Sequence, residues 1–138
     1  MTHRHHHQRL TSIVLIAIVH DHHHRHHHER TIHMSSVTLT VGHTANLSIG
    51  YFDQNGNPML TTPTPDAPPA WTDTTPATGT LTPAASGLTA TELAIAAGAD
   101  TVSVALAVGG VSFTGSIDVT VQSVPQVLTS IQILSTVS

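Results

Sequence analysis

Histidine is the residue type in this sequence with the clearest capacity for chemistry. The chain contains 13 histidines, and all except His43 precede Met34. Neutral imidazole binds Zn²⁺, Ni²⁺ and Cu²⁺, so clustered histidines predict binding of a divalent transition metal. The candidate ligands form two blocks, His3, His5, His6, His7, His22, His23, His24, His26, His27 and His28.

A metal site also needs ligands held in one geometry by supporting contacts, whereas a low-complexity run offers many interchangeable weak modes. Other interpretations of residues 1–33 therefore stay open. The segment is a disordered tail, an extension derived from expression, or sequence upstream of a true start at Met34. The residues after Met34, SSVTLTV, are typical of the beginning of a domain.

Asp53, Asn55 and Asn57 stand at alternate positions, as oxygen ligands do in calcium-binding loops. The complete loop requires a bidentate carboxylate further on, and position 64, where that spacing would place it, is Thr. The stretch DQNGNP at 53–58 is better explained as a turn, because Asp and Asn bond to their own backbone and Gly accepts positive φ. A turn is the interpretation we prefer over a calcium site.

The sequence offers little for catalysis. His43 coexists with Ser and Asp residues, so a Ser-His-Asp arrangement is arithmetically available. However, the chain has no G-x-S-x-G, P-loop, dinucleotide or H-E-x-x-H motif, and His43 follows Gly42 in a predicted turn. We expect His43 to be a solvated loop residue and the protein not to be an enzyme, with no catalytic residues and no bound cofactor.

Charge is distributed unevenly along the chain. Its basic residues, Arg4, Arg9, Arg25 and Arg30, all precede Met34, and later residues include six acids but no Lys or Arg. A surface without cations cannot neutralise phosphates, so this part is not expected to bind nucleic acid. The chain has no cysteine, which excludes disulfides and thiolate metal sites.

An apolar run, Ile13–Val19, separates the two His blocks. A membrane-spanning helix needs about 20 such residues, so the run predicts no membrane span. Its length and preceding basic residues are closer to a signal peptide, but no small-x-small cleavage site follows it.

The strongest structural pattern is a β-hairpin over Thr101–Val121. Apolar residues alternate on both sides of Gly109-Gly110, a pair suited to the positive φ angles of a two-residue turn. That turn pairs Val108 with Val111, Leu106 with Phe113, Val104 with Gly115 and Val102 with Ile117. The other face, with Ala105, Ala107, Ser112 and Thr114, is small and uncharged, which makes it a candidate contact surface.

Alternating apolar residues predict further strands at 37–41, 45–51 and 88–95. The Pro-rich stretch at 61–70 is predicted to be a surface loop or edge segment. Trp71, the single Trp, is expected in the core because it is the largest packing unit available.

Beyond Pro125, residues 127–134 form another apolar stretch, and Ser130-Ile-Gln-Ile-Leu is similar to Ser36-Val-Thr-Leu-Thr. We therefore predict three parts: a His-rich tail (1–33), a β-sandwich (34–123) and a C-terminal strand or the start of a further repeat (124–138). Because exposed strands pair readily, residues 127–138 are candidates for forming a homo-oligomer or tandem array.

Together, SVTLTVGHTANLSI, DQNGNP, Trp71 and the hairpin resemble the bacterial immunoglobulin-like domains over residues 35–122. These domains occur in surface adhesins and on phage tail and capsid proteins. The resemblance implies an all-β, immunoglobulin-like antiparallel sandwich without catalytic residues. It also implies a structural or binding module on a virion or an extracellular cell surface, which contacts a protein or a surface glycan. A metal-binding protein that uses the His blocks, with the sandwich as carrier, is the alternative.

Overall fold

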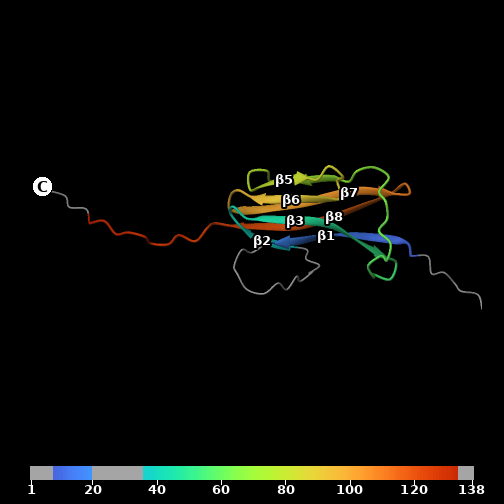
Figure 1. Ribbon diagram of the computed structural model, residues 1–138, viewed down its shortest axis with the longest axis horizontal. Helices are drawn as coiled ribbons and strands as arrows, with labels where there is room; N and C mark the ends of the chain where they lie inside the picture. Colours follow the sequence, from blue (N-terminus) through green and yellow to red (C-terminus); the bar gives the residue numbers. More distant parts are fainter. Residues whose placement is uncertain (1–7, 20–35, 134–138) are drawn as a thin grey trace, which may run out of the picture.

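The structure, a computed structural model, describes residues 8–19 and 36–133. These residues form eight strands and no helix, and the strands stack as two layers (Figure 1). The strands are β1 (Leu10–Val19), β2 (Ser36–Thr40), β3 (Thr44–Asp53), β4 (Ala70–Asp73), β5 (Gly79–Pro83), β6 (Thr89–Ala94), β7 (Gly98–Val108) and β8 (Val111–Gln122). The described residues accordingly contain no helix long and apolar enough to cross a membrane.

The strands divide into two four-stranded sheets, in the orders β1-β3-β6-β5 and β2-β8-β7-β4. These orders correspond to the two sheets of immunoglobulin domains, with β2 added beside the last strand. All pairs are antiparallel except β2 with β8, which run parallel from Ser36↔Asp118 to Thr40↔Gln122. The predicted all-β sandwich is confirmed, and the parallel pair is a departure from a purely antiparallel one.

The β7–β8 hairpin has the predicted register. Val108 pairs with Val111, Leu106 with Phe113, and Val102 with Ile117. Gly109 and Gly110 have φ angles of 58° and 79°, which fit a tight primed turn. Because the apolar set of both strands faces one side, the hairpin supplies much of the core.

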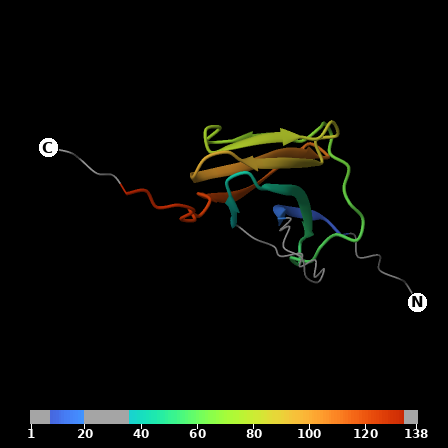
Figure 2. The ribbon, with the colours of Figure 1, turned by 60° about the vertical axis from the view of Figure 1, so that its left-hand side comes forward.

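The core lies between the sheets and contains aliphatic side chains from β1, β2, β3, β6, β7 and β8. Trp71 on the edge strand β4 is half-buried at the margin of this core instead of at its centre. Its indole Nε1–H donates to the carbonyl oxygen of Gly87 at 2.7 Å, which satisfies the polar end of the ring. The Pro-rich stretch is the connection between β3 and β4, as predicted (Figure 2).

Residues 10–19 differ from the predicted tail, because they form β1. This strand pairs with β3 from Leu10↔Asp53 to Val19↔Ala45, and it buries Ile13 and Leu15 to 6% and 0% exposure. Residues 10–19 therefore belong to the sandwich, although the predicted domain boundary at residue 33 placed them in the tail. The physical reason is that a short β-branched run fits a sheet as well as it fits a signal peptide.

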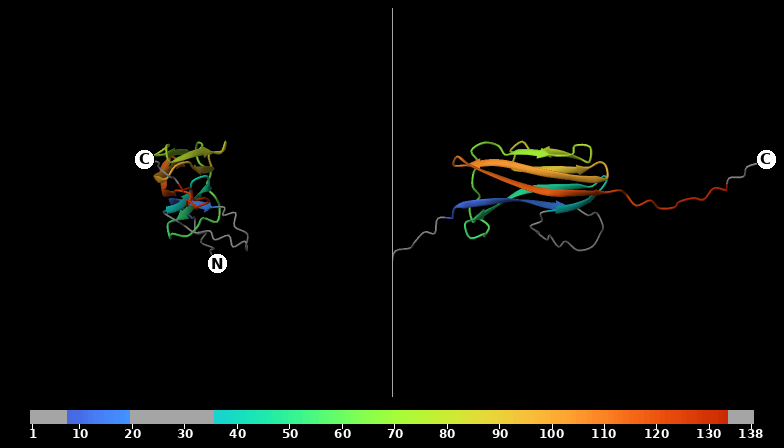
Figure 3. Two further views of the ribbon diagram at one scale, coloured as in Figure 1. Left: turned by 90° about the vertical axis from the view of Figure 1, so that its left-hand side faces the viewer. Right: turned by 180° about the vertical axis from the view of Figure 1, so that it is seen from behind.

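The C-terminal segment, defined here as residues 123–133, forms no strand, which differs from the strand predicted within 124–138, while the alternative of a further repeat stays a prediction. It pairs with no other described strand, and it extends away from the sandwich (Figure 3). It leaves from the end of the sandwich where β8 finishes, which we call the exit pole. The opposite end, where the β7–β8 turn and the start of β1 lie, we call the hairpin pole (Figure 3).

Candidate functional site

The predicted metal ligands in the two His blocks lie outside the described residues. In 8–19 and 36–133, no group of three or more His, Asp or Glu side chains is arranged to hold a metal ion. His43 is exposed beside the β2–β3 turn, as expected for a solvated loop residue. The metal-binding hypothesis therefore stays a prediction about the His blocks.

The stretch at 53–58 forms the predicted turn. Asp53 Oδ1 accepts hydrogen bonds from the backbone N–H groups of Asn55 at 2.9 Å and Asn57 at 3.0 Å. Oδ2 accepts a hydrogen bond from Gln8 Nε2 at 3.2 Å. The bond from Asn57 is the main cause that lowers the pKa of Asp53. Since both oxygens already accept hydrogen bonds, the carboxylate organises this turn, which confirms the preferred interpretation.

Three acidic side chains, which we call the acidic cluster, lie between the sheets: Asp73 on β4, Glu92 on β6 and Asp100 on β7. Glu92 is completely buried, and neither of its carboxyl oxygens has a hydrogen-bond partner. Gly79 on β5 makes room for it, because a Cβ at that position would collide with Glu92 Oε1. The sheet is thus shaped around an inward carboxyl group.

Asp100 is the anchored member of the acidic cluster. Its Oδ1 accepts hydrogen bonds from Thr74 N, Thr74 Oγ1, Thr75 N and Thr101 N, at 2.7 to 3.0 Å. Its Oδ2, like Oδ1 of Asp73, is buried without a partner. Asp100 therefore fixes the chain that follows β4 and directs one unpaired oxygen into the interior.

Burial and the neighbouring negative charges make Glu92 hard to ionise. Desolvation is the largest cause, and Asp100 and Asp73 add repulsion, which raises the pKa of Glu92 to about 7. Desolvation, with a contribution from Asp100, also raises the pKa of Asp73. Neither of the two hollows described below is lined by these acids. The chemistry of the acidic cluster is proton uptake coupled to stability.

The sequence reasoning missed this cluster. The pattern that reveals it is the alternation in β6, where Ala90, Glu92 and Ala94 share the inward face. It also missed the role of Asp66 in the Pro-rich loop. Asp66 Oδ1 and Oδ2 accept hydrogen bonds from the N–H groups of Gly109 at 2.9 Å and Gly110 at 2.8 Å, which tie the loop to the hairpin turn.

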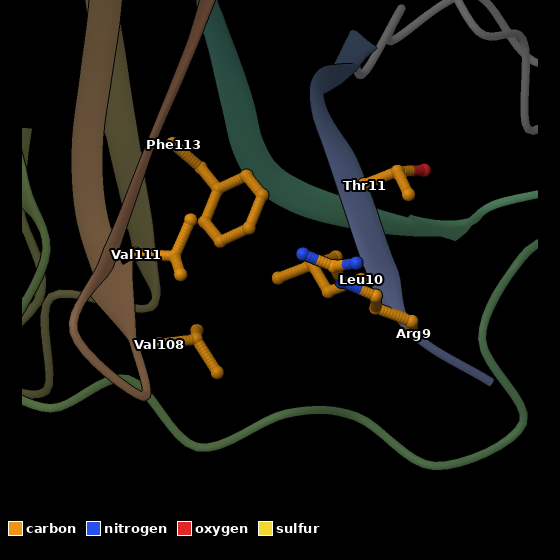
Figure 4. Close-up of a pocket in the computed structure, with 6 residues that line it drawn as sticks. All are labelled: Arg9, Leu10, Thr11, Val108, Val111 and Phe113. Atoms are coloured by element: carbon orange, nitrogen blue, oxygen red, sulfur yellow. The ribbon is translucent and has the colours of Figure 1, made fainter. Parts of the chain in front are cut away.

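The hairpin pole carries an apolar hollow of ≈ 370 Å³. Val108, Val111 and Phe113 of the β7–β8 hairpin lie on one side of it, and Leu10 and Arg9 lie on the other (Figure 4). Its volume lies within the range of about 300–1,000 Å³ that is typical of binding pockets. A second hollow, of ≈ 540 Å³, includes Ala105 and Thr114 of the predicted neutral face in its lining.

At the exit pole, apolar side chains protrude instead of lining a hollow. Large apolar side chains of the C-terminal segment are uncovered, at 59% to 95% exposure: Val124, Val127, Leu128, Ile131 and Ile133. Such a concentration of exposed aliphatic residues is typical of an interaction site. The two poles therefore present an apolar recess and an apolar extension at opposite ends of the same molecule.

Comparison with known proteins gives a fold and no family. No protein-family model matches the chain, and no curated protein matches it. A solved structure of domains 1–6 of the surface layer protein SbsC matches at 18% identity and a TM-score of 0.52. That match covers 87% of this chain and 14% of that one. Domains 4 and 5 of the same S-layer protein match at 19% identity and a TM-score of 0.47, over 83% and 46% of the two chains.

Proposed function

We propose that this protein is a non-enzymatic structural module of an extracellular cell surface, which associates with copies of itself through the C-terminal segment. The observation that carries this proposal is the row of exposed aliphatic residues on the C-terminal segment, which extends away from the sandwich. Removing apolar surface of this kind from water lowers the free energy, so contact with another chain that covers it is favourable. The likeness in fold to domains of a surface layer protein supports the cell-surface setting.

The described surface supports a structural role for a second reason. Near its turn, the outer face of the β7–β8 hairpin presents small, uncharged side chains, including Ala105, Ser112 and Thr114, and Asp118 lies further along the same face. The small side chains near the turn suit close packing against a neighbour, and no cation stands among them to recruit an anionic ligand. Contact with a different protein or a surface glycan remains a prediction, as does membership in the bacterial immunoglobulin-like family.

Deletion of residues 126–138 tests the proposal. We expect the average molar mass of the full chain, measured by light scattering after size exclusion, to rise with concentration. The deleted chain should stay monomeric with an unchanged melting temperature, because the described part of the deleted segment pairs with no described strand. Leu60→Ser is the matched control, since it removes another aliphatic side chain, 91% exposed, outside the segment.

Each alternative outcome contradicts one part of the proposal. A full chain that remains monomeric at every concentration argues against self-association. A deleted chain that associates as strongly as the full chain argues against the segment. A deleted chain that unfolds shows that the segment is a strand of its own domain.

A further inference from the structure

The C-terminal segment repeats the sequence of strand β1. Residues 10–13 and residues 128–131 both read Leu-Thr-Ser-Ile. The following residues are Val-Leu-Ile in β1 and Gln-Ile-Leu after Ile131. The two stretches therefore have the same order of apolar and polar residues, except that Gln132 stands where β1 has Val14.

Each shared residue has a defined task in β1. Leu10 lines the apolar hollow at the hairpin pole, and the Thr11 hydroxyl donates to the carbonyl oxygen of Asp53 at 2.7 Å. Ser12 is exposed, and Ile13 is buried in the core. A strand with the same four residues can make the same contacts with β3.

The unshared positions are also compatible with the β1 site. Leu15 is completely buried, and Ile133 is the residue at the equivalent place. Val14 is only half-buried, so a polar Gln132 is tolerated there. In the register of β1, Ile131 would face Tyr51 and Ile133 would face Ile49.

The segment cannot take this position in its own molecule. Leu128 would have to lie where Leu10 does, at the hairpin pole beside Phe113. Phe113 lies nine residues before Gln122 in β8, which corresponds to about 30 Å. Leu128 follows Gln122 by six residues, which reach about 20 Å when fully extended. The complementary site therefore belongs to a second copy.

We propose that residues 128–133 of one copy occupy the β1 position of the next copy, where they pair antiparallel with β3. This inference rests on the proposed self-association and names its receptor. The segment leaves one molecule at its exit pole and enters the next at its hairpin pole, so successive copies join head to tail. A heterologous contact of this kind produces open chains of molecules.

The molecule's own β1 competes for the same place, so weakening β1 should promote exchange. Leu15→Asp places a charge at a completely buried position of the own strand, while Ile133 of another copy remains able to fill it. We expect this variant to associate at lower concentration than the wild type, with a melting temperature that rises with protein concentration. Leu15→Asp combined with Ile133→Asp should lose both effects.

A pair of variants in the segment distinguishes strand exchange from non-specific hydrophobic association. Ser130 and Ile131 are both exposed in the free molecule, but in the β1 register only Ile131 points into the core. Ile131→Asp should therefore raise the concentration needed for association more than about tenfold, because it buries a charge. Ser130→Asp should leave that concentration within about threefold.

A disulfide test does not depend on a weakened β1. The chain has no cysteine, so only introduced thiols can bridge. In the register of β1, Ser130 faces Phe52 of the next copy, within the Cα separation that a disulfide spans. Phe52→Cys with Ser130→Cys should give covalent dimers and a ladder of higher oligomers under oxidation. Phe52→Cys with Ser123→Cys, which also lies in the segment, is the control and should not.

The outcomes distinguish this inference from the proposed function. If deletion of 126–138 abolishes association but Ser130→Asp and Ile131→Asp weaken it equally, and the cysteine ladder is absent, the segment docks elsewhere and the inference is wrong. If the full chain remains monomeric at every concentration, the proposed function is wrong as well. Association of the Leu15→Asp, Ile133→Asp double variant as strong as that of Leu15→Asp also overturns strand exchange.

Discussion

Glu92→Gln should make the sandwich more stable at neutral and alkaline pH. The substitution preserves the shape of a side chain that is completely buried and whose carboxyl oxygens have no hydrogen-bond partner. It removes the charge that Asp100 and Asp73 repel. An amide in this place still lacks partners, but it never has to be ionised in a low-dielectric interior.

The size of the effect follows from the pKa of Glu92, which is about 7 in the folded protein against an ordinary value of 4.5. The folded state holds the proton more tightly than the unfolded state. The stabilising contribution is therefore complete below pH 4.5, falls as pH rises, and is lost once pH passes through the folded pKa of about 7. The total loss amounts to about 3 kcal/mol.

Urea unfolding of both proteins between pH 4.5 and pH 8.5 measures this contribution. Since other carboxyl groups titrate as well, the informative quantity is the difference in unfolding free energy between variant and wild type at each pH. That difference should grow by about 3 kcal/mol across the range in favour of Glu92→Gln. Asp118→Asn is the control, because it removes one charge from an exposed position. A difference that stays constant with pH would refute the assigned burial of an ionisable Glu92.

Three further substitutions test other contacts. Leu15→Ala should lower the unfolding free energy by about 3 kcal/mol because it empties a completely buried position, whereas Ile18→Ala, 45% exposed on the same strand, should change it little. Equal effects in thermal unfolding would show that β1 does not belong to the core. Asp66→Ala should cost about 1 kcal/mol by releasing the hydrogen bonds to Gly109 and Gly110, and amide exchange at these two glycines should accelerate. Unchanged amide exchange at these glycines would contradict the hydrogen bonds from the hairpin turn to Asp66. Trp71→Phe should cost about 1 kcal/mol through loss of the bond to Gly87, and an unaltered melting temperature would contradict it.

Patterns confined to neighbouring residues were predictable from the sequence. The β7–β8 register follows from the alternation of apolar side chains around Gly109-Gly110, since a slip by one residue would turn the apolar set outward. The Asp53 turn follows from side chains that bond to their own backbone. In both cases one short stretch contains the partners, so the local pattern determines the geometry.

Features that depend on distant partners were not predictable in this way. The apolar run Ile13–Val19 fits either a signal peptide or a strand, and its pairing with the edge of β3 is what makes it a strand. Glu92 becomes perturbed because β4 and β7 bring Asp73 and Asp100 towards it, although these acids are separated in sequence. Similarly, Asp66 can cap the hairpin only because the connection between the sheets passes the turn.

The place of β1 connects the start of the chain to its association. A chain that began at Met34 would lack β1 and leave Leu47 and Tyr51 of β3 without the strand that covers them. The C-terminal segment of another copy then has no competitor for the position, so strand exchange should be strongest in such a chain. A chain that begins at Met1 exchanges only when its own strand opens. Intact-mass measurement on the natural protein, combined with its molar mass in solution, distinguishes the two cases. If the form that begins at Met1 associates as strongly as the form that begins at Met34, β1 and the segment do not compete for the same position.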